Sequence, residues 1–292
     1  MKVIIAPTAN LAQTILADLS VEAEYGSIVI EGTQYTAAHH QAQGLYKGRH
    51  IGGGRPAPCN DSQIPFLADS ATALVSHIDV DTLGGLMRAQ ARLSHLFEAQ
   101  HSAFWDFAES VDVSGWHKAD PKHSEFLKLS ALAAWIQDNR PQIPRDQISD
   151  ISDFCEKAFV FAERVLSADD QALDVGARFI NNQNNLNETS WLTTTPANVV
   201  VRKSDSFVNH LYRDPNDLVG AAIVAYNTKL KSITISLESP IANISCRQIV
   251  QDLWGMEAGG HDGIAGSPRG QDMSEADLIT AVNAVSQRLV SL

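Results

Sequence analysis

The sequence has only three cysteines in 292 residues, no long hydrophobic run and no cluster of basic residues. Cys59, Cys155 and Cys246 lie far apart and match neither a zinc-ligand spacing nor a disulfide framework, so we expect a reducing, cytoplasmic compartment. No apolar stretch approaches the roughly 20 residues needed to span a bilayer. The opening segment, residues 1–7, is too short for a secretory signal and is typical of a strand. These absences predict a cytoplasmic protein with no membrane partner.

The net charge is −12, and no basic stripe interrupts the acidic composition. Proteins that hold long nucleic acid neutralise its phosphates with Lys and Arg, so we do not expect long nucleic acid as a partner. A small phosphorylated substrate is compatible with an acidic protein, because bound metal ions can supply local positive charge. The sequence also lacks a Gly-x-Ser-x-Gly elbow, a Walker loop and a Gly-x-Gly-x-x-Gly turn after a strand.

Short apolar strands alternate with helical stretches in the first part of the chain. The expected strands are residues 3–6, 27–30 and 73–76, and the expected amphipathic helices are residues 11–19 and 84–100. This alternation predicts an α/β fold with a largely parallel N-terminal sheet and flanking helices. Residues 44–61 are rich in Gly and Pro, and we expect them to form a surface or active-site loop.

The pattern of the second part predicts a smaller C-terminal α/β domain across a cleft from the first. Helical spacing covers residues 126–137 and 148–166, and a polar break follows at residues 181–185. We therefore expect domains at residues 1–185 and 186–292. The later elements are expected strands at 197–202, 221–226 and 232–237, a hairpin loop at 227–231, and helices at 247–254 and 274–290. Ser274 and Asp277 have the spacing of a capping-box-like pair at the start of the last helix.

His77, Asp79 and Asp81 alternate where an apolar run meets a small-residue turn. In an extended segment, residues at i, i+2 and i+4 point to one side, so an imidazole and two carboxylates would converge. Such a set suits a hard or borderline divalent cation, which would also offset the repulsion between the carboxylates. The competing interpretation, in which Asp81 only caps the next helix, explains one of the acids.

Other polar side chains are candidates to complete this site. His39 and His40 follow a strand, and at most one of these adjacent residues is expected to face a given site. Asp112 lies in a polar turn with His117, where an exposed loop is a fair competing explanation. These residues predict a metal site made of His77, Asp79 and Asp81, with one of the His pair and Asp112 completing the shell.

A second unusual segment, residues 259–266, places His261 among glycines. Glycine-rich turns let backbone amides approach an anion closely, so Gly259, Gly260 and His261 are candidates for a phosphate site. Arg269, just beyond, can pair with a phosphate bidentately. Arg213 and Arg247 are weaker candidates of the same kind, because surface arginines are common.

These residues resemble the DHH phosphoesterase superfamily, which is named for an Asp-His-His motif. Its members include single-strand exonucleases, oligoribonucleases, inorganic pyrophosphatases and cyclic dinucleotide phosphodiesterases. Residues 197–292 resemble the DHH-associated substrate domain, because Gly259, Gly260 and His261 are followed by Ala265-Gly266 and a helix. His77-x-Asp79-x-Asp81 is similar to the first metal motif of the family, and His39-His40 is similar to its His pair.

The resemblance implies a bound pair of Mn²⁺ or Mg²⁺ ions. The sequence departs from the motif pattern of the family at two points. Ala38 stands before the His pair where the family normally has Asp, and the pair precedes the His-x-Asp-x-Asp segment instead of following it. Either the motifs are permuted here, or one correspondence is wrong. In the second case, Asn10, after the first expected strand, stands where the first metal motif could have been, that motif has decayed, and residues 77–81 serve another role.

The sequence thus predicts a divalent-metal-dependent phosphohydrolase acting on a small nucleotide or short oligonucleotide. Asp79, Asp81 and His40 would act with metal-activated water, and His261 would bind the phosphate. The alternative is a non-catalytic nucleotide- or phosphate-binding protein on the same fold. A single-strand nuclease would need a basic groove assembled from scattered Lys and Arg. A homodimer is left open.

Overall fold

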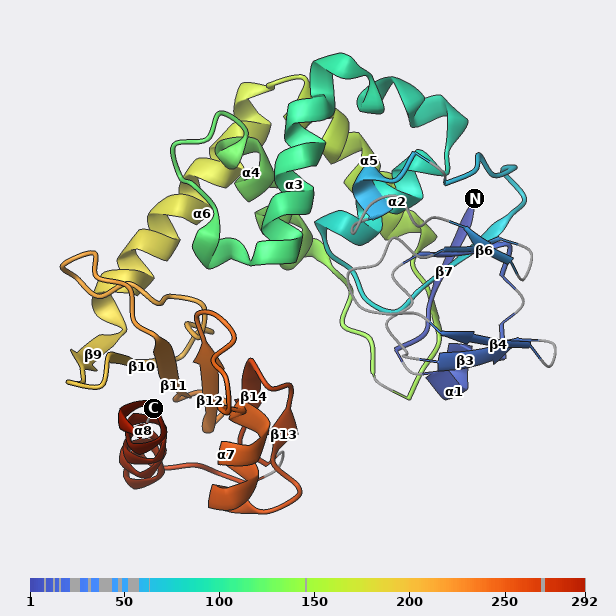
Figure 1. The fold of residues 1–292 in the computed structure, drawn as a ribbon. Helices are drawn as coiled ribbons and strands as arrows, with labels where there is room; N and C mark the ends of the chain where they lie inside the picture. The colour runs from blue at the N-terminus through green and yellow to red at the C-terminus, as the bar shows by residue number, and fades with distance from the viewer. Residues whose placement is uncertain are drawn as a thin grey trace. The chain divides into compact units, whose positions relative to one another are not determined.

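The computed structural model describes residues 1–7, 9–12, 14–15, 17–21, 27–30, 33–36, 44–46, 49–51, 58–62, 64–144, 146–268 and 271–291. The chain divides into two compact units, Met1–Ile180 and Asn181–Leu292 (Figure 1). No helix within the described ranges is long and apolar enough to cross a membrane. The catalytic and substrate-binding roles expected for the two domains, and the cleft between them, stay predictions.

The first unit is built on a mixed sheet whose central strands run parallel, in the order β6-β5-β2-β7-β1-β8. Parallel pairs join β2 (Leu19–Val21) to β7 (Thr72–Val75) and β7 to β1 (Lys2–Ile5). The outer strands β5 (Gly44–Tyr46), β6 (Arg49–Ile51) and β8 (Ser149–Asp150) pair antiparallel with their neighbours. The predicted α/β class is confirmed for this unit, and its parallel character is confined to the central strands.

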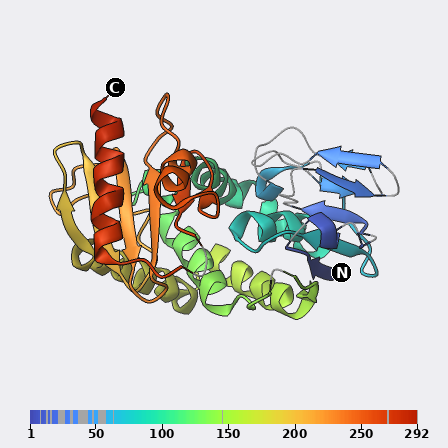
Figure 2. The same cartoon turned by 90° about the horizontal axis from the view of Figure 1, so that it is seen from below.

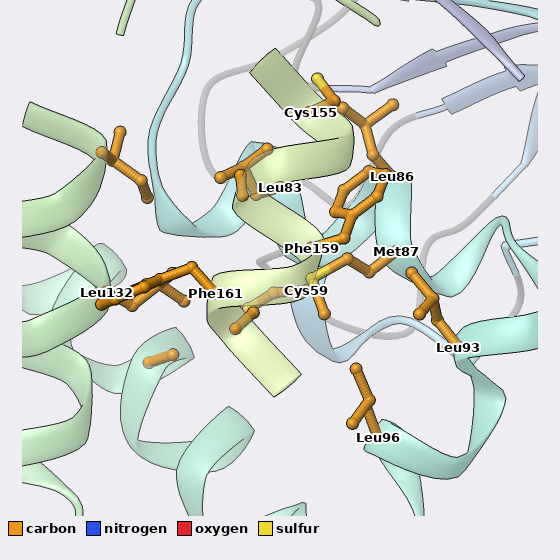
Figure 3. Packing of buried hydrophobic residues seen from close by; sticks show 14 of the residues in the cluster. Cys59, Leu83, Leu86, Met87, Leu93, Leu96, Leu132, Cys155, Phe159 and Phe161 are labelled. Carbon is orange, nitrogen blue, oxygen red and sulfur yellow. The ribbon is translucent and has the colours of Figure 1, made fainter. Parts of the chain in front are cut away.

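Both faces of these central strands are covered, as is usual for parallel strands. On one face, Ile4 and Leu74 pack near α1 (Ala9–Ala12). On the other face, Val3, Ile5 and Val75 join the main core. That core is built from α2 (Val80–Arg88), α3 (Ser102–Ser114), α4 (Phe126–Asn139) and α5 (Ser152–Leu166), with the 3₁₀ turns η1 (Pro58–Asn60), η2 (Ala91–Phe97) and η4 (Trp116–Lys118). The 3₁₀ turn η3 (Ala99–His101) has no buried residue. Figure 3 shows Leu86 of α2 beside Phe159 of α5 in this core.

Several predicted elements of the first unit are wrong in extent. The helix expected over 11–19 is only the short α1, and Leu19 belongs to β2. The loop expected over 44–61 contains the hairpin of β5 and β6 and the turn η1. The helix expected over 84–100 is α2 followed by 3₁₀ turns. The strand over 27–30 exists as β3 (Ser27–Ile30), but it pairs only with β4 (Thr33–Thr36) in a separate antiparallel ribbon among the described residues.

The polar segment 181–185 does not break the chain as predicted. It lies inside α6 (Asp170–Thr189), which continues from the first unit into the second. Gln is a good helix former and Asn is only moderately unfavourable, and their side chains stay in water when the helix is exposed. The run of amides therefore marks a solvent-facing stretch of one helix and not a change of secondary structure.

The second unit contains a sheet in the order β13-β14-β12-β11-β10-β9. Its strands are β9 (Trp191–Thr194), β10 (Val199–Ser204), β11 (Ala222–Asn227), β12 (Ser232–Leu237), β13 (Gly259–Gly260) and β14 (Ile264–Gly266). Only β10 and β11 pair in parallel among these, and the predicted hairpin between β11 and β12 is confirmed.

Two helices cover one face of this sheet (Figure 2). They are α7 (Cys246–Trp254) and α8 (Glu275–Val290), which correspond to predicted helices. Ser274 caps α8 and forms the predicted capping box with Asp277, which lowers the pKa of that carboxyl by hydrogen bonds to Ser274. On the opposite face, Tyr212 packs on Val200 and Ile223.

Candidate functional site

The carboxyl end of β7 brings His77 and Asp79 together. The Nε2 atom of His77 lies 2.9 Å from Oδ2 of Asp79, and both side chains are half-buried. Ile78 between them points into the main core, so the alternation expected of an extended segment holds at these three positions. Ligands of open α/β sheets commonly bind outside the carboxyl ends of parallel strands, which makes this pair the candidate site.

Asp79 is also the N-cap of α2. Its Oδ1 accepts a hydrogen bond of 2.7 Å from the amide of Thr82, and Oδ2 faces His77. Burial works to raise the pKa of Asp79, but the His77 imidazole and the Thr82 amide outweigh it and hold that pKa below its usual range. Asp79 is therefore ionised at neutral pH and presents negative charge beside an imidazole.

Asp81 does not join this pair, contrary to the prediction. The helix α2 begins at Val80, so the two-residue period of an extended segment ends before Asp81. The Asp81 side chain is buried, and its Oδ1 accepts a hydrogen bond of 2.9 Å from the amide of Cys59. Asp81 is therefore not part of the predicted three-ligand set. It is also not the helix cap, because Asp79 has that position.

One face of α2 holds the η1 turn through the backbone of Cys59. Asp81 accepts from the Cys59 amide, and Nε of Arg88 donates to the Cys59 carbonyl at 2.8 Å. Gly84 lies between them on the same face, and a Cβ there would come within 2.3 Å of Cys59 Cβ. Glycine at position 84 is therefore required for the close packing of α2 on η1.

We expect Asp81→Ala to lower the free energy of unfolding by at least about 2 kcal/mol, because it orphans the buried Cys59 amide. Asp81→Asn keeps an acceptor oxygen and should cost less. Urea unfolding measures both variants. Equal stability of Asp81→Ala and the wild-type chain would contradict this structural role.

The imidazole of His77 and the carboxylate of Asp79 are donor types that bind divalent cations. Their 2.9 Å separation is that of a direct hydrogen bond, which a bound cation would replace. Within the part of the chain that the structure describes, however, no three His, Cys, Asp or Glu side chains gather as a metal-binding group. The described residues thus offer a two-donor site, and Asp81 is not part of it.

The remaining predicted ligands divide into two groups. His39, His40 and Arg269 lie outside the described residues. Asp112 lies in the last turn of α3 instead of the expected loop, and His117 lies in η4. Asp112 acts electrostatically on the buried Cys59, whose pKa is raised first by burial and then by Asp81, with Asp112 adding to the effect.

The glycine-rich segment of the second unit forms the hairpin of β13 and β14 at the sheet edge. The His261 amide donates to the carbonyl of Ile264 at 2.7 Å, and the His261 side chain is exposed. The hairpin is bound to the start of α7: Ser245 donates to Asp262 Oδ1 at 2.6 Å, and Arg247 Nε donates to the Gly260 carbonyl at 2.7 Å. The loop expected from the sequence is therefore a hairpin fixed by hydrogen bonds. The Arg247 side chain binds the backbone of this hairpin.

The glycines of this hairpin are not equivalent. Gly260 has φ of +151°, and a Cβ there would lie 2.4 Å from the Ile264 carbonyl oxygen, so the hairpin itself requires glycine. A Cβ at Gly259 or Gly263 would meet nothing within 4 Å. Packing explains Gly260 alone among these three, because the space beside Gly259 and Gly263 would admit a side chain.

One polar residue beside the candidate site received no role in the sequence prediction. Ser76 Oγ lies 2.8 Å from Nδ1 of His77, so both ring nitrogens of the histidine have partners. The only signal in the sequence was a hydroxyl residue directly before the histidine, and adjacent residues in an extended segment normally point apart.

No protein-family model and no functionally curated protein matches the sequence. Among solved structures, the chain is similar to RecJ in complex with Mg²⁺ from Thermus thermophilus, with 16% identity and a TM-score of 0.36 over 73% of this chain and 38% of that one. It is also similar to an exopolyphosphatase-related protein from Bacteroides fragilis, with 13% identity and a TM-score of 0.31 over 77% of this chain and 61% of that one. The chain thus spans well under half of RecJ, and TM-scores of this size establish no shared function.

Proposed function

We propose that the protein is a divalent-metal-dependent phosphohydrolase acting on a small nucleotide or short oligonucleotide. The observation that carries the proposal is the His77–Asp79 pair at the carboxyl end of a parallel strand, 2.9 Å apart. It combines an imidazole with an ionised carboxylate at the sheet edge where ligands of α/β proteins bind. The acidic composition favours a small substrate over a long polyanion.

The residues at this edge would have separate tasks. His77 and Asp79 would hold Mn²⁺ or Mg²⁺, which when bound polarises a phosphoryl oxygen and lowers the pKa of water. The start of α2 directs backbone amides and the positive end of its dipole to the same edge, which favours a phosphate group. The further ligands expected from the sequence, His39 and His40, belong to this proposal as candidates.

The hairpin of β13 and β14 would bind phosphate in the second unit. Gly259 and Gly263 present exposed backbone that no side-chain packing explains, and the exposed His261 lies between them. Asp262 accepts from Ser245, an arrangement that directs its carboxylate toward the start of α7. Arg269 remains a candidate phosphate ligand from sequence alone.

We expect Asp79→Asn to reduce Mn²⁺-dependent hydrolysis of bis-p-nitrophenyl phosphate by about 100-fold or more, since even residues that only orient a ligand cost 10–100-fold. Asn is as good an N-cap as Asp, so this variant removes the charge and keeps the start of α2. Initial rates with and without Mn²⁺ and a small nucleotide panel provide the measurement.

Asp169→Asn is the matched control. Asp169 accepts from the amide of Ala172 at 2.9 Å at the start of α6, as Asp79 does from Thr82, but has no histidine partner in that arrangement. It should keep wild-type turnover. Loss of turnover in both variants, or in neither, would contradict a specific role of Asp79.

Because the described residues supply two donors and no third, a second function is also to be tested. In this alternative, the protein binds a phosphate ligand and does not hydrolyse it. Binding of a nucleotide without Mn²⁺ binding or turnover would favour it. Stoichiometric Mn²⁺ binding that Asp79→Asn abolishes would favour the enzyme.

A further inference from the structure

Ser76, His77 and Asp79 form a continuous chain of polar contacts at the end of β7. Ser76 Oγ lies 2.8 Å from Nδ1 of His77, and Nε2 of His77 lies 2.9 Å from Oδ2 of Asp79. All three residues are half-buried, and Asp79 is fixed further by its bond to the Thr82 amide. The imidazole is therefore held from both sides, and its orientation is set by two residues within the same short segment.

The two contacts of the ring are compatible with more than one position of its proton. A neutral imidazole has one N–H donor and one acceptor nitrogen, and an ionised carboxylate only accepts. In the neutral tautomer with Nε2–H, the ring donates to Asp79, and Nδ1 accepts from the Ser76 hydroxyl. If a cation binds through Nε2, the proton has to be on Nδ1, and the Ser76 oxygen then accepts it.

A hydroxyl group serves both states, because rotation about the C–O bond turns a donor into an acceptor. A carboxylate or a carbonyl would accept only, and an alanine would offer neither bond. Histidines that bind metals generally need a partner on the other ring nitrogen to fix the tautomer and the ring orientation.

We propose that Ser76 is a positioning residue that accommodates both tautomers of His77 and so allows His77 and Asp79 to receive a divalent cation with the ring held in place. This inference rests on the proposed function, because it assumes that the pair binds a cation. It adds a residue that touches neither cation nor substrate and acts through His77.

The test compares the full-length wild-type chain with Ser76→Ala and Ser76→Thr. Threonine keeps the hydroxyl and suits the end of a strand. Free Mn²⁺ measured by electron paramagnetic resonance gives the affinity of each protein. We expect Ser76→Ala to weaken Mn²⁺ binding about 10-fold or more, as loss of a residue that orients a metal ligand does. Ser76→Thr should stay within about 3-fold of wild type by the same reasoning.

The ring nitrogens of ¹⁵N-labelled histidine provide a second readout, with the His77 signals assigned from a His77→Asn variant. In the wild-type protein and in Ser76→Thr, we expect the Nδ1–H tautomer with saturating Mg²⁺. A serine that does not hold the ring would leave the His77 nitrogen signals of Ser76→Ala the same as those of the wild-type chain. Far-ultraviolet circular dichroism checks that Ser76→Ala is folded.

The outcomes separate the two proposals. If the wild-type chain binds neither Mn²⁺ nor Mg²⁺, the proposed function and this inference both fall. If it binds the metal but Ser76→Ala binds equally well, only the role of Ser76 falls. If the His77 tautomer of the wild-type chain does not become Nδ1–H on Mg²⁺ addition, His77 does not bind the cation through Nε2, and both the proposed metal pair and this inference fall.

Discussion

Arg202→Met is expected to lower the free energy of unfolding of the second unit by about 3–5 kcal/mol, because it leaves several buried acceptors unsatisfied at about 1–3 kcal/mol each. Arg202 lies fully buried on β10 and donates to the carbonyls of Asn187 and Leu211 at 2.7 and 2.6 Å. It also donates to Asn187 Oδ1, to Ser190 Oγ and to the Arg213 carbonyl. Methionine fills much of the space but leaves these acceptors without donors.

The surroundings of Arg202 support this expectation. Burial lowers the pKa of the guanidinium to about 10, and Asp214 acts in the opposite direction. The cation is thus held mainly by oxygen dipoles, and it joins α6, β10 and the 205–220 segment. Lysine carries three donors and cannot reproduce the fork geometry, so Arg202→Lys should be intermediate.

Arg213→Met is the control, since the Arg213 side chain is half-exposed and pairs with the exposed Asp217. It should change stability by less than about 1 kcal/mol. Hydrogen exchange of the β10 and β11 amides in urea follows the second unit alone. Equal costs for Arg202→Met and Arg213→Met would contradict the structural role of Arg202.

Gly260→Ala should disrupt the hairpin of β13 and β14. The new Cβ would lie 2.4 Å from the Ile264 carbonyl oxygen at a backbone φ of +151°, a combination that costs about 1–3 kcal/mol in strain alone. We expect the His261 amide, which donates to Ile264, to lose its protection against hydrogen exchange. Phosphate-ligand affinity should fall in parallel if the proposed role of the hairpin is right.

Gly259→Ala separates structure from ligand contact. Its Cβ would meet nothing within 4 Å, so protection of the His261 amide should be unchanged. A loss of phosphate affinity in this variant, with the hairpin intact, would place the ligand beside Gly259. Undiminished protection in Gly260→Ala would show that the hairpin tolerates a side chain there.

The sequence identified elements wherever hydrophobic period and end signals agree. The capping box of Ser274 and Asp277, and the alternation that gave β11 and β12, are local features that the structure retains. Predicted elements were wrong where a tertiary contact overrides the local pattern. Leu19 belongs to a strand because β2 pairs with β7, a tertiary contact that overrides the helical spacing of residues 11–19.

In the candidate site, too, local spacing was a reliable guide and contacts beyond it were not. His77 and Asp79 were predictable because the extended period holds as far as the N-cap of α2. Asp81 was misassigned because the period changes at Val80, and its partner, Cys59, is 22 residues away. Ser76 was missed because its contact with an adjacent side chain depends on rotamers, which residue spacing does not specify.

The burial of every cysteine has a practical consequence for measuring the motions of this protein. Cys59 and Cys155 lie in the first unit and Cys246 in the second, each almost fully shielded from solvent. Burial raises the pKa of Cys155 and Cys246 to about 12 and that of Cys59 well above its usual range. Because only the thiolate reacts readily, alkylation requires local opening. Each unit therefore carries a native reporter whose labelling rate, followed by mass spectrometry, measures how often that unit opens without any engineered probe.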